Sequence, residues 1–301
     1  MKGLLFALAV VELVIAAPCR AGLDEGLSAY KSDDFAKARN ELEPLAAHGN
    51  AVAQRTLASM YAIGQGVKAD NVQAAHWLRL AAEQGDPDAA SLLGRRYSAG
   101  TGVPQDDASA VYWWERAARK GNVDAQVSLA QSYEFGRGVR QDYSQAFTWY
   151  QKASKGTHSQ ASMGLAEMYH EGLGVRRDPS RAFALYADLA RRGENGAQAQ
   201  LAAMYEHGDG VSKDLLVSCA WYEVIGEPTT SEKQTLEDWI ELIANPQSAE
   251  RLRGVIAGLE QHDKESRERV CAQLTHEEAE KARSMASAWK PGQLITDGAE
   301  N

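Results

Sequence analysis

Residues 53–85 read AQRTLASMYAIGQGVKADNVQAAHWLRLAAEQG, and this stretch decides the fold because the chain repeats its pattern every 36 residues. In each copy a Tyr stands three residues before the motif Gly-x-Gly-Val, and an Asp stands three residues after the Val. The motif begins at Gly64, Gly100, Gly136, Gly172 and Gly208. A fixed internal period of this length is typical of solenoid proteins. We therefore predict five repeats, at 50–85, 86–121, 122–157, 158–193 and 194–229.

Each repeat predicts two helices joined by the glycine loop. Asn50 is a good N-cap for the first helix, and Ala53 and Leu57 follow at the spacing of one helical face. The two glycines end this helix, because glycine adopts left-handed backbone conformations without a steric penalty. Asp70 caps the second helix, and Gly85 ends it. Because one helix pair cannot bury its apolar face alone, the repeats are expected to stack into an all-α solenoid.

The segments outside the repeats predict helical caps at both ends of the stack. Residues 22–49 have the pattern of a helix pair, at 23–31 and 35–47, without the glycine loop. Residues 230–291 predict a C-terminal helical cap, whose last helix begins with a capping box formed by Thr275 and Glu278. The remaining expectations are helices at 231–244 and 249–271, an irregular fourth junction at Gly156 and Thr157, and a flexible tail at 292–301.

The first 21 residues have the features of a secretory leader. A lysine precedes an apolar stretch, and small residues stand before a cleavage position at Gly22. Export would leave Cys219 and Cys271 as the cysteines of the mature chain, and an oxidising compartment would preserve a disulfide between them. The alternative is two buried free thiols, since Cys219 occupies a position that is apolar in the other repeats. Both alternatives remain open on sequence alone.

The consensus of residues 53–85, A-x3-L-A-x-M-Y-x2-G-x-G-V-x2-D-x3-A-x2-W-x3-A-A-x2-G, resembles the Sel-1-like repeat family. The resemblance covers residues 50–229. It implies a right-handed α-solenoid, related to the tetratricopeptide repeats, whose concave face holds partner proteins or peptides. A cysteine-rich secreted branch of the family carries a disulfide in every repeat and is linked to β-lactam binding. The present chain lacks those paired cysteines, so that activity is not carried over.

Charge and motifs argue against several classes of function. The net charge of −9 and the absence of a dense Lys/Arg run make nucleic acid a poor partner. Gly-x-Gly follows a predicted helix rather than a strand, which excludes dinucleotide binding. We predict no catalytic residues, no cofactor and no metal. One alternative is a metal site formed by His170, Glu171, Glu206 and His207 at neighbouring helix ends, but a solvated polar rim is the preferred interpretation.

Positions that vary beside fixed packing residues mark the candidate binding surface. The residue after the second core alanine of the first helix and the residue after the tyrosine both change from repeat to repeat. The candidate partner-binding residues are Arg55, Ser59, Arg95, Gln131, Glu134, Glu167, His170 and Glu206. If these residues line the groove, it is basic toward the N-terminus and acidic toward the C-terminus, which would orient an extended peptide. The alternative is that these charges only keep a long surface soluble.

The sequence therefore predicts a non-catalytic scaffold that binds a protein or peptide in the periplasm or outside the cell. The chain is expected to be a monomer without a transmembrane segment. The alternatives are a purely structural spacer, and a cell-wall hydrolase or a protein that binds peptidoglycan or β-lactams.

Overall fold

The computed structural model describes residues 22–155, 158–225 and 246–295, and every regular element within these ranges is an α-helix. The chain divides into two compact units, Met1–Ala153 and Ser154–Asn301. No helix of the described ranges is both long enough and apolar enough to span a bilayer. The predicted leader at 1–21, the junction at 156–157, the helix at 231–244 and the last tail residues at 296–301 lie outside the described residues.

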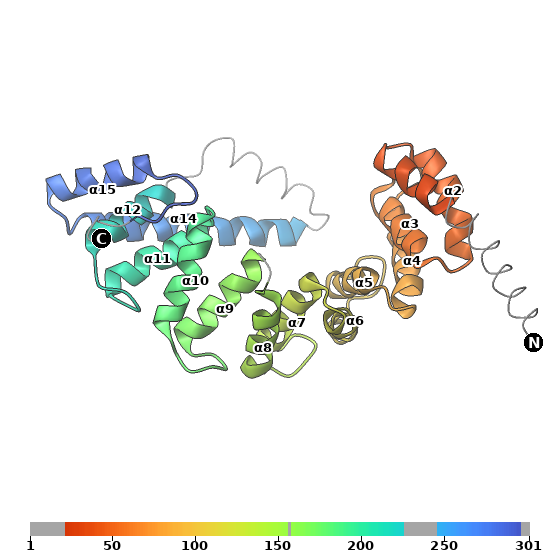
Figure 1. The fold of residues 1–301 in the computed structure, drawn as a ribbon, viewed down its shortest axis with the longest axis horizontal. Coiled ribbons are helices and arrows are strands. Elements are labelled where there is room, and N and C mark those ends of the chain that lie inside the picture. Colours follow the sequence, from red (N-terminus) through yellow and green to blue (C-terminus); the bar gives the residue numbers. More distant parts are fainter. Residues whose placement is uncertain (1–21, 156–157, 226–245, 296–301) are drawn as a thin grey trace, which may run out of the picture. The chain divides into compact units, whose positions relative to one another are not determined.

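The first unit consists of helices that each contact the next one along the chain (Figure 1). Residues 22–31 are helical, and Leu23 and Leu27 pack against a cluster of buried residues that includes Leu42 of α2. The other helices of this unit are α2 (Phe35–Ala47), α3 (Ala51–Ile63), α4 (Asn71–Glu83), α5 (Pro87–Ala99), α6 (Asp107–Arg119), α7 (Val123–Phe135) and α8 (Tyr143–Ala153). From α3 onward, two successive helices correspond to one repeat.

The second unit continues the helix pairs and adds the C-terminal helices. Its helices are α9 (Ser159–Glu171), α10 (Pro179–Arg191), α11 (Asn195–His207), α12 (Leu215–Ile225), α14 (Pro246–Cys271) and α15 (His276–Ala288). Both α14 and α15 pack against α12. Helix α14 begins three residues earlier than predicted, because proline is accepted in the first turn of a helix. The capping box of Thr275 and Glu278 begins α15.

The start of the predicted flexible tail is held in place. The backbone N–H of Gly292 donates to the carbonyl oxygen of Arg191, and Ile295 is buried. The sequence pattern did not reveal this contact because a single isoleucine among polar residues gives no periodic signal.

The repeated Tyr and Asp are joined by a backbone hydrogen bond that closes each glycine loop. The N–H of the Asp donates to the carbonyl oxygen of the Tyr at 2.8 to 2.9 Å in all five repeats. The Asp side chain accepts from N–H groups of the following helix, as Asp106 does from Ala108 and Ser109. The hydroxyl of Ser109 also donates to the Asp106 carboxylate, and this hydrogen bond, followed by those of the N–H groups, lowers the pKa of Asp106. One residue therefore fixes the loop with its backbone and begins the next helix with its side chain.

The two glycines of the loop have different roles. The first ends the helix in a left-handed conformation, as at Gly136 with φ of 67°. The second also has a positive φ and lies against the start of the second helix of the preceding repeat. A Cβ at Gly138 would stand 2.1 Å from the carbonyl oxygen of Asp107, and one at Gly102 would stand 2.0 Å from that of Asn71. We predicted both glycines as helix terminators, but the second is required for contact between repeats.

Buried glutamines also connect neighbouring repeats. The side-chain amides of Gln54, Gln126 and Gln198 donate to the carbonyl oxygens of Ala46, Ala118 and Ala190 at 2.9, 3.1 and 3.3 Å. Each accepting carbonyl lies in the last turn of the preceding helix, where backbone oxygens lack helical partners. The predicted alanine stripes form the surrounding core, with side chains that are almost completely buried.

Candidate binding site

The candidate residues all lie on the first helices of the repeats, and Arg55 is the first of them along the chain. Its guanidinium group forms ion pairs with Asp86 at 3.3 Å and Asp88 at 3.6 Å, at the start of α5. The hydroxyl of Ser59 donates to the backbone carbonyl of Arg55. Arg55 therefore connects α3 to α5 within the stack, and its charge is already balanced by two carboxylates.

The prediction that Glu134 and Glu206 face an open groove is wrong. Glu134 is only 7% exposed and accepts a hydrogen bond of 2.6 Å from the hydroxyl of Tyr150 on α8. Glu206 is 9% exposed and pairs with Arg269 of α14 at 2.9 Å. The position after the repeated tyrosine turns toward neighbouring helices, so a long acidic side chain there is covered. Glu134 and Glu206 therefore do not contribute exposed negative charge to the acidic end of the bipolar groove.

The substitution Tyr150→Phe is expected to destabilise the first unit by about 2 kcal/mol, because it removes a hydrogen bond to a buried carboxylate. Urea unfolding of the purified protein measures the change in the free energy of unfolding. The matched control is Tyr112→Phe, since the Tyr112 hydroxyl is exposed and accepts from Arg116 on its own helix. Equal effects of the two substitutions would contradict a special role for the Glu134–Tyr150 pair.

His170 lies between two carboxylates in the second unit. Its Nε2 atom is 2.8 Å from Asp209, and its Nδ1 atom is 2.9 Å from Glu171. Glu167, one turn before, is exposed. Burial, followed by the charges of Glu167 and Glu171, raises the pKa of Tyr186, which stacks edge-on to His170.

The four side chains of the alternative metal site do not gather around one point. His207 bonds to the backbone carbonyl of Ala203 through Nδ1, and Glu206 pairs with Arg269. His170 is occupied by Glu171 and Asp209. The interpretation as a solvated polar rim does not hold for Glu206, which is buried.

Two other candidates, Arg95 of α5 and Gln131 of α7, line one hollow of about 270 Å³ in the first unit. Serines contribute hydroxyl groups to its walls, and Trp114 of α6 forms part of its lining. The polar and charged residues that line the hollow are Arg95, Ser98, Asp107, Ser128, Gln131, Ser132 and Arg137. Both variable positions of the repeat contribute, since Arg95 and Gln131 belong to one of them and Ser98 to the other.

The second aromatic residue of each doublet proves to be buried. Trp114 follows Trp113 and is 8% exposed, and Tyr150 follows Trp149 and is 3% exposed. The indole Nε1–H of Trp114 donates to the carbonyl oxygen of Ser91 at 3.3 Å within the same repeat. Arg96, which follows Arg95 on α5, also has a structural role. Its guanidinium group donates to the side chain of Asn71 and to the carbonyl oxygen of Thr101, and burial lowers its pKa.

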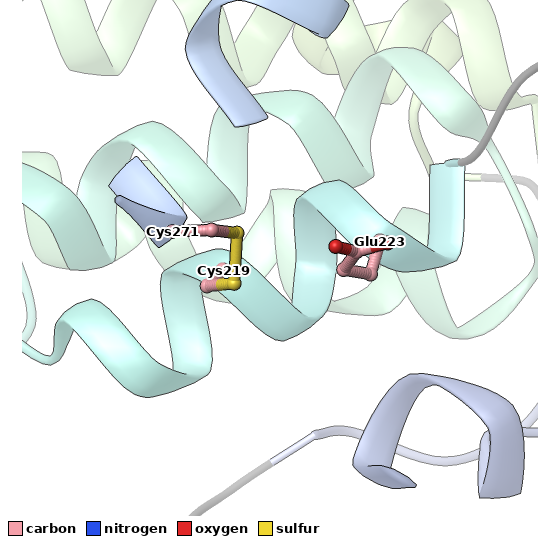
Figure 2. A group of neighbouring side chains, drawn as sticks. All are labelled: Cys219, Glu223 and Cys271. Atoms are coloured by element: carbon pink, nitrogen blue, oxygen red, sulfur yellow. A yellow bond between two sulfur atoms is a disulfide. The ribbon is translucent and has the colours of Figure 1, made fainter. Parts of the chain in front are cut away.

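Cys219 and Cys271 are joined by a disulfide that connects α12 to the end of α14 (Figure 2). Their Cα atoms are 5.2 Å apart, a normal distance for such a bridge. Glu223 lies one turn further along α12, and its carboxylate is within 4.8 Å of both sulfur atoms. This group is not a metal site in its bridged form, because metal coordination requires thiolates and both sulfurs are bonded to each other.

Comparisons with known proteins identify what the chain resembles. The model of the Sel1 repeat matches residues 51–86, 87–122, 123–158, 157–194 and 196–224. No curated protein matches the chain. A Sel1 repeat protein from Oxalobacter formigenes is similar with 28% identity and a TM-score of 0.65, over 75% of this chain and 95% of that one. The protein c5321, a protective antigen present in uropathogenic Escherichia coli strains and displaying an SLR fold, is similar with 26% identity and a TM-score of 0.67. That match covers 93% of this chain and 63% of c5321.

Proposed function

Because this chain belongs to the Sel1 repeat family, we propose that it is a scaffold that binds a protein or peptide along the first helices of its repeats. The Sel1 repeat fold is an all-helical solenoid that generally serves protein–protein interaction and is generally non-catalytic. The observation that supports a site on this chain is the hollow at Arg95 and Gln131. There, side chains from positions that vary among the repeats meet on adjacent first helices.

The proposal includes a location outside the cytoplasm. The disulfide between Cys219 and Cys271 supports it, because disulfides persist in oxidising compartments and are rare in the cytosol. The leader-like composition of residues 1–21 supports it as well. Fractionation of cells that make the full chain, with mass mapping of the two cysteines, tests this part. Recovery of the protein in the cytoplasm with both thiols free would refute it.

A photo-crosslinking amino acid placed at Gln131 tests the binding face directly. We expect crosslinks from Gln131, and from the same group placed at Ser98, to one and the same partner in the native cell. The matched control position is Tyr112, which is exposed on α6 and does not line the hollow. The same partner captured equally from Tyr112 would contradict binding at this face.

The alternative of a cell-wall enzyme makes a different prediction. A scaffold leaves peptidoglycan fragments intact, so purified protein incubated with such fragments should release no new products by mass spectrometry. Any cleavage that depends on the protein would overturn the non-catalytic assignment.

A further inference from the structure

Two arginines line the hollow of the first unit. Arg95 lies on α5, and Arg137 is the middle residue of the glycine loop after α7. Within residues 22–155, 158–225 and 246–295 neither guanidinium group forms an ion pair, whereas Arg55 on the neighbouring helix has two. Arg137 lies over the ring of Phe135 at 5.2 Å, which leaves its N–H groups for hydrogen bonding.

Both arginines are departures from the repeat. The positions equivalent to Arg95 hold Ser59, Gln131, Glu167 and Ala203, and those equivalent to Arg137 hold Gln65, Thr101, Leu173 and Asp209. Each position is therefore basic in one repeat alone, and the two basic residues come from different repeats. The stacking of α5 beside α7 brings them to the same hollow.

The lining next to the arginines departs from the repeat too. Gly94 replaces the alanine found at this position in the other four repeats, and Trp114 replaces a leucine or tyrosine. A Cβ at Gly94 would stand 2.5 Å from the Nε1 atom of Trp114, so the missing methyl group is what lets the indole lie against α5. Together these exchanges give the hollow an aromatic wall beside two free cations.

We propose that this hollow binds a carboxylate group of a peptide, held between Arg95 and Arg137. Guanidinium groups bind carboxylates through paired N–H donors, and the hydroxyl of Ser98 and the amide of Gln131 provide further partners. The flanking peptide atoms lie against Trp114. The inference rests on the proposed function, because it gives the ligand chemistry of one site on the same face.

Asp107 favours a carboxylate over a phosphate. Asp107 is among the residues that line the same hollow, so its carboxylate adds one negative charge near the two arginines. A singly charged carboxylate balances this set, whereas a doubly charged phosphate adds repulsion from Asp107. Asp107 is also an acceptor for a backbone N–H of a bound peptide. The carboxylate itself comes either from the C-terminus of the peptide or from an Asp or Glu side chain.

Fluorescence anisotropy with three pools of short random peptides, each labelled with an uncharged dye of the BODIPY class, tests the inference on the purified protein. One pool has a free C-terminus and no acidic residue, the second has an amidated C-terminus and one fixed Glu, and the third is amidated without any acid. We expect the first or the second pool to bind and the third to bind at least about tenfold more weakly. The stronger of the first two identifies the source of the carboxylate.

Variants link the binding to the two arginines. Arg95→Gln and Arg137→Gln should each weaken the acidic pool at least about tenfold, and Arg95→Lys should restore part of the affinity. The matched control is Arg140→Gln, which removes an exposed charge of the same loop outside the hollow. Thermal unfolding of each variant confirms that the fold is kept, as expected for exposed side chains.

Several results would overturn the inference. These are equal binding of the neutral amidated pool, unchanged affinity in both arginine variants, or stronger competition by inorganic phosphate than by acetate. If crosslinking from Gln131 persists when Arg95→Gln and Arg137→Gln are combined, the proposed scaffold function is kept and the proposed carboxylate site is refuted. If no pool binds and no crosslink forms, both fail.

Discussion

Gly138→Ala is expected to lower the free energy of unfolding of the first unit by about 2–5 kcal/mol. Gly138 has a φ of 68°, where an L-residue with a side chain is strained by about 1–2 kcal/mol. The new Cβ would also stand 2.1 Å from the carbonyl oxygen of Asp107 and 2.3 Å from its carbonyl carbon. These are backbone atoms, so they cannot turn aside as a flexible side chain would, and the two repeats must separate. Overpacking of this kind adds about 1–3 kcal/mol.

Gly121→Ala separates the two causes. Gly121 has a φ of 91°, and a Cβ there meets nothing within 4 Å. This variant should therefore show the backbone strain of about 1–2 kcal/mol without the clash. Urea unfolding of both variants and of the unsubstituted protein gives the change in the free energy of unfolding that each substitution causes. If Gly138→Ala is no more damaging than Gly121→Ala, the second glycine is not needed for contact between repeats.

Cys271→Ala is expected to lower the stability of the second unit by about 4 kcal/mol, from the chain entropy of a closed loop of this length. The bridge spans a sequence separation of 52 and joins α14 to α12. Cys271 is the better choice for substitution because it is half-buried, whereas Cys219 is fully buried. The Cys219 thiol left behind behaves as a small apolar group and adds little to the change.

Reduction of the unsubstituted protein is the matched control. Dithiothreitol should lower its unfolding transition to that of Cys271→Ala, and should leave the variant unchanged. Differential scanning calorimetry with and without the reductant measures both. A reductant effect on Cys271→Ala, or none on the unsubstituted protein, would show that the bridge is not the source of stability.

The fold was predictable to the extent that one residue type repeated for one physical reason. Glycine at a helix end, Asp before a helix and alanine on a helical face each act through local rules, so their periodic recurrence located the helix pairs. The role of Gly138 was not predictable in this way. Its neighbour is a carbonyl group in another repeat, and a glycine kept for close approach looks the same in sequence as one kept for a turn.

The candidate site was only partly predictable for a related reason. Variation among repeats selected Arg95 and Gln131, which the structure brings to one hollow. It also selected Glu134 and Glu206, because variation alone does not separate an exposed position from one whose partner varies with it. Their partners, Tyr150 and Arg269, come from other helices. Arg137 was not predicted because it lies within the repeated Gly-x-Gly loop, where both glycines have a structural role and the variable middle residue was not considered.

The backbone hydrogen bond between the repeated Asp and Tyr has a consequence for how such a chain can change over generations. Main-chain atoms close each loop, and the residue between the two glycines joins in only through its backbone N–H, so its side chain is free to vary as long as it is not proline. In this chain it is an arginine facing a hollow in one repeat and Asp209 bound to His170 in another. In each repeat, a single substitution at this position can therefore change the chemistry of the surface while the helix pair keeps its structure.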